Sequence, residues 1–84
     1  MAIIDYNKAI QQANEIDDLI KQMDREIVRL DNLINQIKGE WCGPASEQFR
    51  NELLMLVNDM LTTRYSMSTV SNSIRTVANQ LNVN

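Results

Sequence analysis

The side chains that could do chemistry are one cysteine and a group of carboxylates. Cys42 is the only cysteine, and the sequence contains no histidine. A thiol nucleophile needs a neighbouring base or a group that lowers its pKa, and histidine is the commonest residue in that role and the commonest metal ligand. We therefore expect a protein that is not an enzyme. One cysteine also excludes a disulfide within the chain, so we interpret Cys42 as a passive residue.

The carboxylates that could hold a cation lie in the first half of the chain and are Asp17, Asp18, Asp24 and Glu26. Basic residues alternate with them, and the Asp-rich, glycine-turned spacing of a calcium loop is absent. Asp17 and Lys21, four residues apart on a helix, form a favourable pair worth about 0.3–0.5 kcal/mol. We expect these acids to form a solvated helix face, with no metal and no cofactor.

Two long helices are indicated by an apolar heptad repeat in each half of the chain. In the first half, apolar or small residues recur at alternating steps of three and four: Ala2, Tyr6, Ala9, Ala13, Ile16, Ile20, Met23, Ile27, Leu30, Ile34 and Ile37. The second half repeats the pattern with Phe49, Leu53, Leu56, Met60, Thr63, Met67, Val70, Ile74, Val77 and Leu81. A period of 3.5 is typical of a helix that keeps one narrow seam against a partner helix.

A short turn must join the helices, because the chain has two glycines and one proline and all three lie between residues 39 and 44. Glycine suits the end of a helix, and Pro44 suits the first position of the next one. We predict one domain over residues 1–84, with helices at about 3–39 and 45–81 and a turn at 40–44. If the chain reverses there, residue i faces residue 83 − i, which brings the two seams together. The predicted fold is an all-α antiparallel two-helix hairpin.

Apolar residues outside the seams predict a further interface. Those expected at mid-height on the outside of the hairpin are Val28, Leu54, Met55, Val57 and Leu61. Exposed apolar patches commonly mark protein interaction sites, and a chain this short buries only about 60–65% of its unfolded surface when it folds alone. We expect the hairpin to dimerise into a four-helix bundle through these residues.

Charge and hydropathy exclude several other classes of partner. The net charge is −3, and the sequence has no cluster of Lys and Arg. We therefore expect binding neither to nucleic acid nor to anionic lipid. No apolar run approaches the roughly 20 residues of a membrane span, and the N-terminal residues do not resemble a signal peptide. We expect a protein made in the cytoplasm, without stable membrane insertion.

The Trp-X-Gly tripeptide between the two heptad helices, formed by Trp41 and Gly43 around Cys42, resembles that of the WXG family of early-secreted-antigen-like proteins. Phe49 follows in the usual apolar position, and the resemblance spans nearly the whole chain. It implies helical hairpins that form homodimers or heterodimers and leave the cell by type VII secretion, driven by a membrane ATPase. Some members of that family act as effectors, and others escort larger toxins.

The sequence departs from this family in its export signal. Neither Tyr6 nor Tyr65 is followed four residues later by an acid, so the Tyr-x-x-x-Asp/Glu pattern is absent. Three functions therefore stay open: a homodimeric type VII substrate, a targeting partner or chaperone of a larger LXG-type toxin that supplies the signal, and a cytosolic coiled-coil adaptor without a role in secretion.

Overall fold

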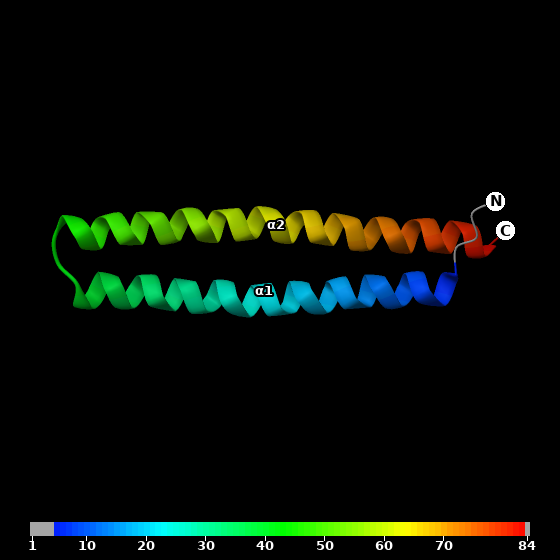
Figure 1. Ribbon diagram of the computed structural model, residues 1–84, viewed down its shortest axis with the longest axis horizontal. Coiled ribbons are helices and arrows are strands. Elements are labelled where there is room, and N and C mark those ends of the chain that lie inside the picture. The colour runs from blue at the N-terminus through cyan, green and yellow to red at the C-terminus, as the bar shows by residue number, and fades with distance from the viewer. Residues whose placement is uncertain (1–4, 84) are drawn as a thin grey trace.

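The computed structural model describes residues 5–83 as two antiparallel helices joined by a short turn, as predicted (Figure 1). Helix α1 runs over Tyr6–Glu40 and helix α2 over Pro44–Val83. The helices lie side by side along their whole length, so the molecule is a rod of 63 × 16 × 15 Å. Within residues 5–83 there is no strand. The hairpin is therefore a single layer of two helices.

The helix ends follow from local chemistry. The Asp5 side chain accepts a hydrogen bond from the Lys8 backbone N–H at 3.2 Å, which caps α1 at its first turn. Gly43 has φ +97°, a conformation open to glycine and strained for other residues. Helix α1 therefore begins at Tyr6 rather than near residue 3, and α2 begins at Pro44, one residue earlier than predicted. Ala2 and Ile3 lie outside the described residues.

The predicted seam of α1 is confirmed. Its buried residues are spaced by sevens, at Ala13, Ile20, Ile27 and Ile34. The alternate rungs of the seam are half-buried beside them, at Tyr6, Ala9, Ile16, Met23, Leu30 and Ile37. The apolar side of α1 therefore faces α2 in the way that the heptad repeat indicates.

The predicted seam of α2 is correct at alternate rungs only. A middle stripe of Leu53, Met60, Met67 and Ile74 is half-buried against α1, as expected. Leu81, the last predicted rung of this stripe, is 51% exposed, so its place in the seam is wrong. The other rungs form an outer stripe that is exposed: Phe49, Leu56, Thr63, Val70 and Val77. In their place α1 contacts an inner stripe on the opposite side of the middle one: Arg50, Val57, Arg64, Ser71 and Ala78. Helix α2 is thus rotated by one heptad position from the predicted packing.

The core of the hairpin is small because two helices can enclose few side chains. Its centre is formed by Ile27, Ile34 and Val57. Four half-buried side chains pack against this centre, namely Met23, Leu30, Leu53 and Met60. Both helices therefore leave much of their apolar surface outside the core, which is the usual reason for such a hairpin to associate further.

Candidate functional site: an apolar face opposite a polar clasp

Polar cross-links close one side of the hairpin. Arg64 donates to both carboxylate oxygens of Asp24, through Nε to Oδ1 and through Nη2 to Oδ2. Such a bidentate pair fixes the geometry of both side chains. Asp24 lies on α1 and Arg64 on the inner stripe of α2, so this pair fixes the rotation of one helix against the other near mid-height.

A second group of polar contacts lies nearer the termini and is centred on Asp17. The Ser71 hydroxyl donates to Asp17 at 2.7 Å and lies 3.3 Å from the Ala13 carbonyl oxygen. Arg75 donates to the other Asp17 oxygen and to the Asn14 amide oxygen, the latter at 2.8 Å. We call Asn14, Asp17, Asp24, Arg64, Ser71 and Arg75 the polar clasp. It joins α1 to α2 at two levels.

Both carboxylates of the polar clasp are stabilised in their charged form. Hydrogen bonds from Ser71 and then Arg75 lower the pKa of Asp17, against a smaller opposing effect of burial. The hydrogen bond from Arg64 is the main cause that lowers the pKa of Asp24, and the same contact raises the pKa of Arg64. Asp17 and Asp24 are therefore both ionised near neutral pH.

The other side of the hairpin is apolar and has no covering element. Residues seven apart lie on one side of a helix, so the outer stripe of α2 forms one line along the helix. This line lies on the opposite side of the middle stripe from the inner stripe, which carries Arg64 and Ser71. On α1 the same side holds the half-buried rungs Ala9, Ile16, Met23, Leu30 and Ile37, with Leu19 and Leu33 more exposed beside them. We call this surface, from the α1 rungs across the middle stripe to the outer stripe, the open face.

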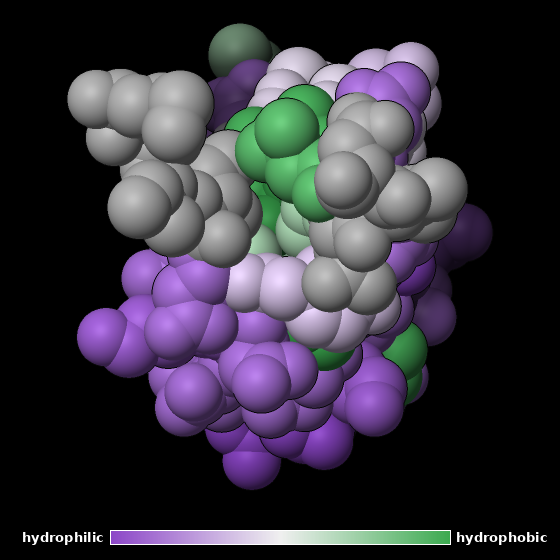
Figure 2. All heavy atoms as spheres, turned by 90° about the vertical axis from the view of Figure 1, so that its right-hand side faces the viewer, coloured by the Kyte–Doolittle hydropathy of each residue, from purple (hydrophilic) through white to green (hydrophobic). Residues whose placement is uncertain are grey.

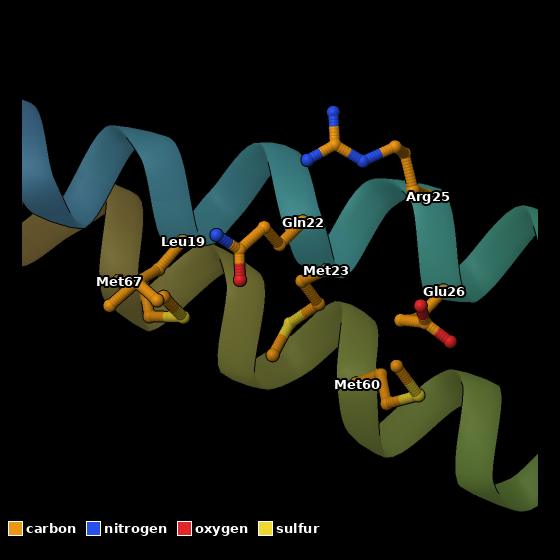
Figure 3. Close-up of a pocket in the computed structure, with 7 residues that line it drawn as sticks. All are labelled: Leu19, Gln22, Met23, Arg25, Glu26, Met60 and Met67. Carbon is orange, nitrogen blue, oxygen red and sulfur yellow. The ribbon is translucent and has the colours of Figure 1, made fainter.

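Three shallow grooves follow one another along the open face. The central one, of about 500 Å³, lies between Leu19 and Met23 on α1 and Met60 and Met67 on α2. Figure 3 shows Met23 reaching from α1 toward α2, and Gln22, Arg25 and Glu26 form the polar part of the lining. A groove near the termini is lined by Ala9, Gln12, Ser73, Ile74, Val77 and Ala78. Methionines adapt their shape to a partner, so the centre of the face suits a protein surface.

The third groove lies at the turn and contains the Trp-X-Gly tryptophan. Trp41 packs edge-on against Phe49, with ring centroids 5.9 Å apart and planes at 83°. The two rings line a groove of about 400 Å³ together with Ile37, Leu53 and Leu56. Trp41 remains half exposed. It therefore extends the open face to the turn end of the rod rather than closing the core.

Hydrophilic and hydrophobic side chains are separated when the rod is seen from the end that carries the termini. Figure 2 shows hydrophilic residues over the lower half, where α1 lies, and a group of hydrophobic residues above them. The outward side of α1 is thus the solvated side, as its charge pattern predicts. Asp18 is exposed there, whereas Glu26 lines the central groove of the open face and pairs with Arg29 at 3.2 Å.

The interface residues predicted from the sequence do not share one surface. Val57 is 6% exposed and belongs to the core, so its assignment to an outward patch is wrong. Val28, Leu54, Met55 and Leu61 are exposed, which agrees with an interface role without testing it. Leu54 and Leu61 lie at seven-residue steps from Arg75, on the side of the polar clasp.

The contribution of Asp17 and Asp24 was missed from the sequence, which indicated a solvated face for them. Their partners lie 40 or more residues away along the chain. The available signal was the occurrence of Arg64 and Arg75 in an otherwise charge-poor half of the chain. Cys42 is exposed in the turn. Among residues 5–83, no group of acidic or cysteine side chains could hold a metal ion.

No protein-family model, no curated protein and no solved structure matches this chain. The class that the fold defines is the helical hairpin, and its candidate site is the open face. Over the described residues, neither helix has a stretch both long and apolar enough to cross a membrane.

Proposed function

We propose that this protein is a protein–protein interaction module whose open face packs on a second helical hairpin to form a four-helix bundle. The observation that carries the proposal is the exposure of the outer stripe, with Phe49, Leu56, Val70 and Val77 each 44–50% exposed. These residues keep a heptad spacing, which is useful only against another helix. A partner that presents a similar pair of helices would cover them.

The dimensions of the open face support this proposal. The rod is 63 Å long and 16 Å wide, so one side offers an area on the order of 1,000 Å². A stable interface buries about 800 Å² on each partner. The face is also continuous, because the three grooves extend from Ala9 near the termini to Trp41 at the turn.

For the biological setting we propose a small WXG-type substrate of a type VII secretion system, acting as a homodimer or with a related hairpin. Support comes from two helices of similar length joined by a turn that contains Trp41 and Gly43. A targeting partner of a larger LXG-type toxin is the second candidate, favoured by the absence of a Tyr-x-x-x-acid signal. Export that stops when the secretion ATPase is deleted would contradict a purely cytosolic adaptor.

Paired charge substitutions test the interface. Leu56→Asp/Val70→Asp places two carboxylates on the open face, at positions that are 45% and 50% exposed. The matched control, Leu54→Asp/Leu61→Asp, places two carboxylates on the clasp side, at positions that are both 46% exposed. We expect the first variant to be monomeric in analytical ultracentrifugation while it remains helical. The second variant should retain the mass of the parent protein.

The reverse result would place the interface on the side first predicted from Leu54 and Leu61. A parent protein that is monomeric at all concentrations and binds no helical partner would contradict the proposed bundle. Export to the culture medium in the absence of any toxin partner would leave the homodimeric substrate as the surviving alternative.

A further inference from the structure

Helix α2 carries two surfaces that could pack against α1, and they share the middle stripe. The observed surface combines the middle stripe with the inner stripe, whose residues are mostly polar or small. The alternative combines it with the outer stripe, in which Thr63 is the sole polar residue. Adjacent stripes of a heptad are about 50° apart around the helix, so a rotation of that size exchanges one surface for the other.

Hydrophobic burial favours the alternative packing. The observed packing leaves Phe49, Leu56, Val70 and Val77 exposed, while it buries Val57 and the smaller side chains of Ser71 and Ala78. It also leaves the Nε atom of Arg50 buried without a hydrogen-bond partner, which is unfavourable for a donor removed from water. Some other interaction must therefore hold α2 in the observed rotation.

The polar clasp is that interaction, because its residues on α2 lie on the side that rotation would move. Arg64 and Ser71 belong to the inner stripe, and Arg75 lies one position beyond it. A rotation of α2 that brings the outer stripe onto α1 carries Arg64, Ser71 and Arg75 away from the carboxylates of α1. The clasp and the alternative packing are thus mutually exclusive.

We propose that the polar clasp is a conformational latch: while it is formed the outer stripe is exposed, and when it is broken α2 rotates and buries that stripe against α1. The occupant of the outer stripe in the second state is the α1 seam of the same chain. The open face is then lost, so the state of the clasp controls whether a partner can bind. This inference concerns the hairpin alone and does not depend on the proposed secretion role.

Neighbouring cysteine reporters distinguish the two rotations. Two single-cysteine variants are made in a Cys42→Ser background. Leu56→Cys lies at a position that is 45% exposed, and Val57→Cys at one that is 6% exposed. The rate of labelling by a maleimide is measured for each, with and without Asp17→Ala/Asp24→Ala. The control is Glu15→Ala/Asp18→Ala, which removes two exposed charges from the same helix and leaves the clasp intact.

With the clasp intact, and at a protein concentration low enough for the hairpin to be monomeric, we expect Leu56→Cys to react faster than Val57→Cys. Loss of the clasp should slow the first and accelerate the second, so that the ratio of rates falls below one. Unfolding would accelerate both reactions, and an unaltered rotation would preserve the ratio; either result would overturn the latch. Partner binding or dimerisation slows Leu56→Cys without accelerating Val57→Cys, so it cannot imitate a rotation.

A charge exchange provides a second test that does not depend on the alanine variants. Asp24→Arg places two guanidinium groups opposite each other and should invert the ratio of labelling rates. Asp24→Arg/Arg64→Asp restores an opposite-charge pair and should return the ratio toward that of the parent. Failure of the second substitution to restore it, in a protein that is still helical by circular dichroism, would contradict the latch.

Discussion

At the turn, Gly43 and Gly39 have different backbone requirements although both have open space around the position of a Cβ atom. Gly43 has φ +97°, and Gly39 lies inside α1. We expect Gly43→Ala to lower the free energy of unfolding by about 1–2 kcal/mol. Gly39→Ala should raise it by about 0.5–1 kcal/mol, because alanine loses less entropy in a helix. Urea unfolding followed by circular dichroism measures both, and equal effects would contradict the turn geometry.

The carboxylates of the polar clasp predict acid sensitivity. The pKa values of Asp17 and Asp24 are lower in the folded protein than in the unfolded chain. Their contribution to stability is therefore complete above the unfolded pKa, about 4, and is lost as the pH falls through the folded pKa. We expect the midpoint of thermal unfolding to decrease as the pH falls below about 4. Asp17→Asn/Asp24→Asn should reduce that decrease, and an unchanged slope would show that other groups cause it.

At the scale of the helices, adjacent residues on α1 should differ sharply in their importance. Ile27 lies in the core at 9% exposure, whereas Val28 is 57% exposed. Truncation of a buried aliphatic side chain costs the free energy of transfer and leaves a cavity. We expect Ile27→Ala to destabilise the hairpin by about 2 kcal/mol and Val28→Ala to change stability by less than about 0.5 kcal/mol. A large effect of Val28→Ala would instead support its predicted place in an interface.

The heptad repeat predicted both helices and the seam of α1, because the buried residues there are the apolar ones. It could not select the seam of α2, since the inner and outer stripes have the same spacing and share the middle stripe. The choice depends on Arg64 and Arg75 reaching acids on the other helix, which is tertiary information. The prediction favoured the more apolar stripe and so overlooked the open face.

For the whole molecule, association should stabilise the fold. A partner that binds the folded chain alone shifts unfolding by mass action, so the unfolding midpoint of a dimer rises with protein concentration. We expect this rise for the parent protein in differential scanning calorimetry. Leu56→Asp/Val70→Asp should abolish the dependence on concentration, whereas a parent midpoint that is independent of concentration would argue against self-association.

The slender cross-section of 16 × 15 Å has a consequence for passage through a pore. A single hairpin that moves along its long axis can cross a channel little wider than one pair of helices without losing its fold. A bundle of two hairpins needs about twice that opening in one direction. If the proposed export operates, the width of the channel decides whether the hairpin crosses alone or as part of the proposed bundle.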